Sequence, residues 1–134
     1  MGTLIDASAL IAVERGQLDP DEAFATAGRR DEAVAIAAIT ASELLHGVHQ
    51  LEGARHVRAE RFVRYWLSAL PVIPAGPEVA HVYATLAAEL AITGTRMGAH
   101  DLLIAATAVH LGYRVATRDP RSFHRVNGLP VDYL

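Results

Sequence analysis

Four acidic side chains border apolar segments of this sequence and are its strongest candidates for chemistry. They are Asp6, Glu43, Asp101 and Asp119. Carboxylates gathered in one crevice repel one another unless a proton or a cation neutralises them. The chain has no cysteine, and oxygen ligands alone favour a hard ion such as Mg²⁺ or Mn²⁺. Such an ion activates water and polarises phosphate, so the pattern favours phosphodiester hydrolysis.

For these acids to meet, strand ends and helix starts must lie at one edge of a sheet. Short apolar runs predict strands at residues 3–5, 34–38, 72–73, 113–117 and 131–134. Helical spacing and terminal signals predict helices at residues 9–15, 20–29, 40–51, 54–70, 77–94 and 101–111, with a short helical turn at 120–125. This alternation indicates an α/β domain with a mostly parallel sheet between helices, whose sites gather at the carboxyl ends of the strands.

Length and composition exclude several classes of protein. The 134 residues, 51% of them hydrophobic, predict one compact domain over residues 1–134 that needs no disulfide or structural zinc. All 12 basic residues are arginine, so a Walker A loop and Schiff-base chemistry are excluded because both require lysine. Charge-free apolar stretches reach about a dozen residues, short of the roughly 20 that a membrane span needs, so we expect a cytoplasmic protein without membrane contact.

Arginine is concentrated in the second part of the chain. Residues 1–53 carry three arginines and nine acids, whereas residues 54–134 carry nine arginines and six acids. This asymmetry is compatible with a polyanionic substrate. Arg96, shortly before Asp101, and Arg118, beside Asp119, are the best candidates for binding phosphate near a metal. The arginines at every third position of residues 55–64 are expected mainly to form a solvated helix face.

Each acid also has a purely structural interpretation. Thr40 and Glu43 match a capping box, in which the glutamate lies three residues after the capping threonine. Asp101 fits a helix N-cap or first turn, and Asp119 before Pro120 fits the start of a turn. Asp6 is harder to explain in this way, because Ser8 is the expected cap of the helix that follows it.

Four segments in register carry a resemblance to a known family. They are Leu4–Ala12, Ile39–Val48, Asp101–Ala108, and Val115–Asp119 together with Phe123. In order and spacing they resemble PIN-domain ribonucleases, and within them the VapC-type toxins of bacterial toxin-antitoxin pairs. The resemblance implies a three-layer α/β/α sandwich and an endoribonuclease that depends on Mg²⁺ or Mn²⁺. It also implies an RNA substrate, a cognate VapB-like antitoxin and a homodimer.

The same resemblance assigns roles within the acidic set. Asp6 and Asp101 correspond to the principal metal ligands, and Glu43 and Asp119 complete the catalytic pocket mostly through water. The fourth motif departs from many relatives, which have Asn in place of Asp119 and often a further acid in place of Ser122. Of the four acids, Asp119 is therefore the one whose role the resemblance supports least.

Two other functions remain open from the residues alone. One is a PIN-like scaffold that binds RNA or a partner without catalysis, although four intact carboxylates argue against it because an unneutralised acidic cluster costs stability. The other is a di-iron carboxylate protein, since Glu43 with His46 and Glu78 with His81 have the required spacing of three residues. The short buried strands argue against that second alternative, because di-iron proteins of this type are bundles of long helices.

Overall fold

The computed structural model describes the backbone of residues 1–134 and every side chain except those of Thr26 and Arg29. Within this described chain, five strands form one sheet in the order β3-β2-β1-β4-β5, and every neighbouring pair is parallel. The strands are β1 (Gly2–Ile5), β2 (Ala33–Ala37), β3 (Val72–Ile73), β4 (Arg114–Thr117) and β5 (Val131–Tyr133). The predicted parallel sheet is confirmed.

Helices separate most of the strands, as predicted. They are α1 (Ala7–Glu14), α2 (Pro20–Arg29), α3 (Ala38–His49), α4 (Gly53–Ala69), α5 (Pro77–Ile92) and α6 (Ala99–Leu111), with a short 3₁₀ helix, η1 (Phe123–Arg125). Proline begins α2 and α5, where its missing N–H is not needed. Gly112 ends α6 in the left-handed region, at φ 69°, a conformation that costs glycine little. No helix in the described chain has the length and apolar character that crossing a bilayer requires.

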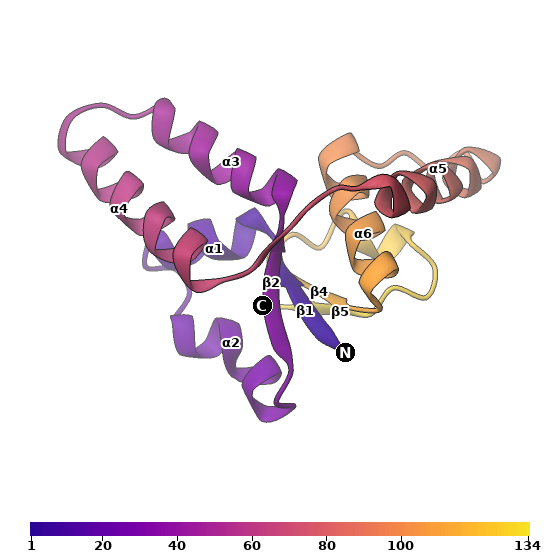
Figure 1. Cartoon of the computed structure of the whole chain (residues 1–134), viewed down its shortest axis with the longest axis horizontal. Helices are drawn as coiled ribbons and strands as arrows, with labels where there is room; N and C mark the ends of the chain where they lie inside the picture. The colour runs from indigo at the N-terminus through magenta and orange to yellow at the C-terminus, as the bar shows by residue number, and fades with distance from the viewer.

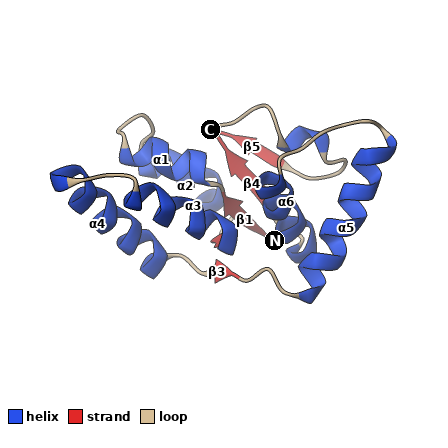
Figure 2. Cartoon of the chain, turned by 90° about the horizontal axis from the view of Figure 1, so that it is seen from above, coloured by secondary structure: helices blue, strands red, loops and turns tan.

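The alternation of side chains along the central strands creates two separate cores. Leu4, Ala35 and Val115 point to one face of the sheet and pack with residues of α5 and α6. Their chain neighbours Ile5, Ile36 and Ala116 point to the other face and pack with residues of α1 to α4. Figures 1 and 2 show these two helical layers on either side of the strands. The predicted three-layer sandwich is therefore confirmed.

The sheet order fixes where a site can form. From β1 the chain proceeds outward through β2 to β3, and then returns to the other side of β1 to form β4 and β5. The carboxyl ends of β1 and β4 therefore flank the point at which the strand order reverses, where parallel α/β sheets bind their ligands. Helices α1 and α3 begin directly after β1 and β2, and α6 runs back toward the start of β4. The N-termini of all three helices thus lie at this edge.

Two predicted helix caps are wrong. The N-cap of α1 is Asp6, whose side chain accepts a hydrogen bond from the amide of Ala9, and not Ser8. The N-cap of α3 is Ala37, so Thr40 lies inside the first turn and its buried hydroxyl has no partner among the described residues. Strand β2 ends at Ala37 and α3 begins at Ala38, so no residue connects them. The N-cap of α3 therefore lies three residues before Thr40, the cap that the sequence predicts. The capping-box explanation of Glu43 is therefore excluded.

A network of charged side chains closes the opposite, amino edge of the sheet. Arg114, the first residue of β4, lies 3.7 Å from a carboxylate oxygen of Glu32 and 3.5 Å from one of Asp132. Arg30 contacts the second oxygen of Asp132, also at 3.5 Å. The Arg114 side chain is only 16% exposed, and its Nε has no hydrogen-bond partner among the described residues. The network therefore joins β4, β5 and the residue preceding β2. Its contacts of 3.5–3.7 Å are long for ion pairs, and the side chains of Arg114, Glu32 and Asp132 are largely shielded from water.

Arg114→Met should lower the free energy of unfolding by about 2 kcal/mol. The substitution leaves Glu32 and part of Asp132 without a counter-charge, and breaking a well-buried pair typically costs about 3–5 kcal/mol, reduced here by partial exposure. Urea denaturation at neutral pH measures the loss. The matched control is Arg64→Met on α4, where the arginine is 78% exposed and the expected loss is below about 0.5 kcal/mol. Equal losses in both variants would contradict the proposed role of the network.

Candidate active site

Asp6 is the most enclosed acid of the candidate site. It follows β1 directly and is 5% exposed. Its Oδ1 accepts hydrogen bonds from the Ser8 hydroxyl at 2.7 Å and the Ala9 amide at 3.3 Å, and its Oδ2 accepts one from the Thr117 hydroxyl at 2.7 Å. Burial raises the pKa of Asp6, and the negative charge of Asp101 raises it further, while these hydrogen bonds oppose the shift.

Two hydroxyl groups connect Asp6 to the end of β4. The oxygens of Ser8 and Thr117 lie 3.2 Å apart. The backbone amide of Arg118 donates to Ser8 Oγ at 3.1 Å, and that of Asp119 donates to Thr117 Oγ1 at 2.9 Å. Because each hydroxyl accepts from an amide, its own proton is free to point at Asp6. The network therefore fixes the Asp6 carboxylate in one orientation at the reversal point of the sheet.

Glu43, in the second turn of α3, faces the same region. Burial raises its pKa, and the charges of Asp101 and Asp6 raise it further. His100 acts in the opposite direction, because its Nδ1 lies 3.2 Å from Glu43 Oε1 and its positive charge, when protonated, stabilises the carboxylate. His100 is the second residue of α6, and its side chain is 64% exposed. The pair therefore joins α3 to α6 beside the acids.

Asp101 completes a group of three acids. It lies in the first turn of α6 and is partly buried, and its charge acts on both Asp6 and Glu43. Asp6 and Asp101 are in the N-cap and the first turn of their helices, where the helix dipole partly offsets negative charge, and Glu43 is one turn further along α3. The first-turn interpretation of Asp101 is confirmed, and it is compatible with a functional role. The structure thus brings together three of the four predicted acids.

Asp119 has a different environment. Its Oδ1 accepts from the backbone amide and the Nε of Arg121, both at 2.9 Å, and its Oδ2 accepts from the Nη2 of Arg121 at 3.1 Å. These hydrogen bonds hold the pKa of Asp119 below its ordinary value. The turn interpretation is therefore confirmed. Asp119 is linked to Asp6 only indirectly, because its amide donates to Thr117.

The donor set suits a hard ion with few protein ligands. Among the described side chains, no three from His, Cys, Asp and Glu converge closely enough to hold a metal by themselves. The charge of Asp101 nevertheless raises the pKa of both Asp6 and Glu43, which places the three acids in one electrostatic environment. Mg²⁺ commonly binds one or two carboxylates and keeps water in its other positions, so these residues fit Mg²⁺ or Mn²⁺ bound by two acids.

The di-iron alternative is wrong. Glu43 and His46 are on α3, whereas Glu78 and His81 are on α5, and these helices cover opposite faces of the sheet (Figure 1). A di-iron site requires its helices to surround one centre. The central sheet makes that arrangement impossible.

The two arginines predicted to bind phosphate occupy different environments. The Arg118 guanidinium donates to the backbone carbonyl of Gln17 at 3.2 Å, so it is held beside the loop that follows α1. Arg96 is exposed in the loop between α5 and α6. Sequence reasoning missed His100 and Arg121, which contact Glu43 and Asp119. The sequence Asp119-Pro120-Arg121 is a turn signal, and a turn at this place brings the Arg121 side chain back to Asp119. This signal could have revealed the contact between Arg121 and Asp119.

The stability of the metal-free parent relative to Asp6→Asn should rise as the pH is lowered from about 7 toward 4. The pKa of Asp6 is raised on folding, so the folded chain holds a proton over a pH range in which the unfolded chain has lost it. Above the pKa of Asp6 in the folded chain, the full free-energy cost of burying its charge lowers stability. That cost disappears below the pKa of Asp6 in the unfolded chain, which is near 3.8. Urea denaturation in the presence of a chelator measures this difference. A parent that loses stability relative to the variant on acidification would contradict it.

Comparison with known proteins agrees with this architecture. Residues 3–129 match the PIN domain model. The chain is 33% identical over 132 residues to Ribonuclease VapC1 of Rickettsia felis, covering 98% of this chain and 95% of that protein. Ribonuclease VapC of Rickettsia bellii shows the same identity and coverage.

Solved structures with the same fold include toxin-antitoxin complexes. VapBC from Salmonella typhimurium, crystallised bound to DNA, contains a chain with a TM-score of 0.84 and 26% identity, matched over 98% of this chain and 97% of that chain. VapBC2 from Rickettsia felis, bound to a DNA fragment from its promoter, gives a TM-score of 0.87 at 22% identity, covering 100% of this chain and 99% of that one. On the family model, the identity to curated relatives and the fold, the chain belongs to the PIN-domain family and, within it, to the VapC group.

Proposed function

We propose that this protein is a divalent-metal-dependent endoribonuclease that serves as the toxin of a toxin-antitoxin pair. The observation that carries the proposal is the common electrostatic environment of Asp6, Glu43 and Asp101 at the reversal point of a VapC-type sheet. Negative charges that raise the pKa values of Asp6 and Glu43 destabilise the metal-free protein, so the presence of these acids is best explained by a cation and its substrate. Residues 1–134 then act as a single catalytic domain.

The family resemblance divides the acids into two pairs. We assign Asp6 and Asp101 as the principal metal ligands, and Glu43 and Asp119 as residues that act mostly through water. A bound Mg²⁺ or Mn²⁺ would supply an activated water and polarise the scissile phosphate of RNA. Ser8 and Thr117 hold the Asp6 carboxylate in orientation through their hydrogen bonds.

Two further residues support the secondary acids. His100 holds Glu43 through its Nδ1, and Arg121 holds Asp119 through two guanidinium nitrogens and its own amide. No side-chain nucleophile is needed in this arrangement. We expect cleavage to leave a 5′-phosphate and a 3′-hydroxyl, as the family resemblance implies.

The partners follow from the relatives. The Salmonella typhimurium and Rickettsia felis neighbours are VapBC complexes, and on that basis we propose a VapB-like antitoxin that binds and inhibits this chain. A homodimer is proposed on the family resemblance alone. We place the activity in the cytoplasm, because RNA is the proposed substrate.

Inducible expression in a bacterial host tests the proposal. The parent chain should arrest growth and generate discrete new RNA 5′-phosphate ends, whereas Asp6→Asn should do neither. Purified parent should cleave the same RNA only when Mg²⁺ or Mn²⁺ is added. Soluble, folded parent that neither arrests growth nor yields new ends would favour a non-catalytic scaffold, and equal cleavage by both purified proteins would indicate a contaminating nuclease.

A further inference from the structure

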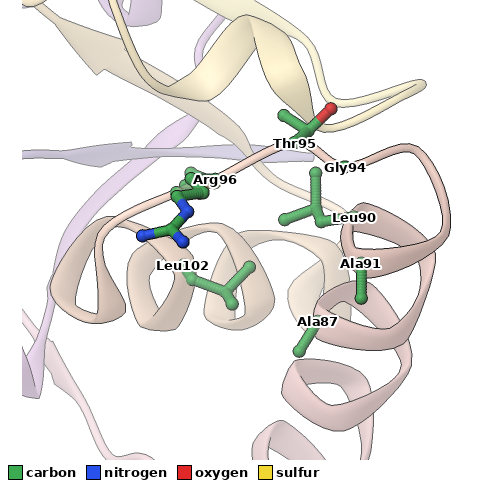
Figure 3. A pocket seen from close by; sticks show the side chains of 8 residues that line it. Ala87, Leu90, Ala91, Gly94, Thr95, Arg96 and Leu102 are labelled. Carbon is green, nitrogen blue, oxygen red and sulfur yellow. The ribbon is translucent and has the colours of Figure 1, made fainter.

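A cavity of about 580 Å³ opens between the end of α5 and the start of α6 (Figure 3). Leu90, Met97 and Leu102 provide apolar surface, and Thr95 and Arg96 provide polar groups. Its volume lies within the range of about 300–1,000 Å³ that is usual for small-molecule sites. Because Leu102 follows Asp101 directly, the cavity adjoins the helix turn that carries a proposed metal ligand.

Arginine side chains connect this cavity to the acids. Arg96 lies at the cavity, and in Figure 3 its side chain extends over α6 toward Leu102. The guanidinium of Arg125, in η1, donates to the backbone carbonyl of Arg96 and so ties the cavity loop to the segment after β4. Arg121, four residues before Arg125, binds Asp119. The three arginines therefore lie between the cavity and the fourth acid.

Two of these three arginines are not paired with an acid. Neither Arg96 nor Arg125 forms a salt bridge among the described side chains, whereas Arg121 is paired with Asp119. On α4, by contrast, Arg64 is paired with Glu60 at 3.0 Å. The charge of Arg125 lowers the pKa of Asp119, so this arginine lies near the fourth acid. A phosphodiester that approaches acids meets repulsion, and arginines without an acidic partner along its path offset it. A cavity with apolar surface beside such arginines matches the two chemistries of a nucleotide, its base and its phosphate.

We propose that this cavity is a subsite for one unpaired base of the RNA, with the adjoining phosphate bound by Arg96 and Arg125. The subsite rests on the proposed ribonuclease function and adds a position at which the strand is held outside the acids. Single-stranded RNA is recognised by splayed bases that lie against apolar surface or a guanidinium plane, and duplex RNA has no free base to insert. The subsite therefore selects single-stranded RNA.

Binding of a fluorescein-labelled single-stranded RNA containing all four bases, measured by anisotropy in the inactive Asp6→Asn background, tests the subsite. Adding Arg96→Gln should weaken binding about 3- to 10-fold at low salt and reduce the slope of log affinity against log salt by up to about 0.7. Adding Ala91→Trp, which fills the cavity, should weaken binding with the slope unchanged. Adding Arg61→Gln on α4 is the control and should change neither quantity.

Unchanged binding in the Arg96→Gln and Ala91→Trp variants would overturn the subsite. Weaker binding only in Arg61→Gln would also overturn it, because the strand would then follow α4. Cleavage by the parent, measured on the same RNA, separates the two proposals. A parent that cleaves while the variants bind normally refutes the subsite alone, and a parent that neither cleaves nor binds refutes both. Unfolding temperatures matching that of the background exclude misfolding as the cause.

Discussion

Asp101→Asn should reduce RNA cleavage by roughly 10²- to 10³-fold or more and leave the protein folded. The carboxylate is a proposed metal ligand, and a neutral amide oxygen binds a hard cation far less strongly. Two effects on stability oppose each other. Loss of a negative charge from the first turn of α6 costs about 0.3–1 kcal/mol, and relief of repulsion with Asp6 and Glu43 returns a similar amount. The net change in unfolding free energy should stay within about 1 kcal/mol.

A matched substitution on β5 provides the control. Asp132→Asn is also an aspartate-to-asparagine change, but the Asp132 side chain binds Arg114 and Arg30 and is not one of the proposed metal ligands. That variant should lose stability and keep cleavage, the reverse of Asp101→Asn. Cleavage with synthetic RNA in Mg²⁺ and urea denaturation measure the two properties. If Asp101→Asn lost more than about 2 kcal/mol, Asp101 would act mainly as a structural first-turn acid.

Most of the fold could be predicted because its signals are local. The apolar runs at Leu4–Ile5 and Val115–Ala116 are strands whose neighbouring residues point to opposite faces, and proline and glycine mark helix ends at Pro77 and Gly112. The capping patterns of the sequence predict later starts for α1 and α3 than the structure shows. In both cases the chain enters a helix directly from a buried strand, so tertiary packing determines the first turn and the capping pattern does not.

The sequence predicts the acids of the site but not the contacts and the burial that surround them. Asp6, Glu43 and Asp101 carry the family pattern, and the structure brings them together. The contact between His100 and Glu43 joins α6 to α3, which are more than fifty residues apart in sequence, so no local signal marks it. The burial that raises the pKa of Asp6 likewise depends on the packing of β1 between β2 and β4. Such electrostatic properties arise only when the sheet is assembled.

Mg²⁺ should raise the unfolding temperature of the parent and have almost no effect on Asp6→Asn. A ligand present at about ten times its dissociation constant stabilises the folded state by about 1.4 kcal/mol, which for a domain of this size corresponds to a rise of roughly 3–6 °C. Asp6 is already oriented by Ser8, Thr117 and Ala9, so little ordering opposes metal binding in the parent. The asparagine variant keeps the shape of the side chain and loses its charge.

Asp119→Asn is the informative companion to this measurement. The Asp119 carboxylate is already bound to Arg121, so the variant should retain most of the temperature rise if Asp119 acts through water. A rise abolished as completely as in Asp6→Asn would make Asp119 a direct ligand instead. Lower pH should reduce the rise in the parent, because burial raises the pKa of Asp6 and protons then compete with the metal for this carboxylate. Loss of the rise in Asp6→Asn, its retention in Asp119→Asn and its decline with acid would together identify Asp6, and not Asp119, as a direct metal ligand.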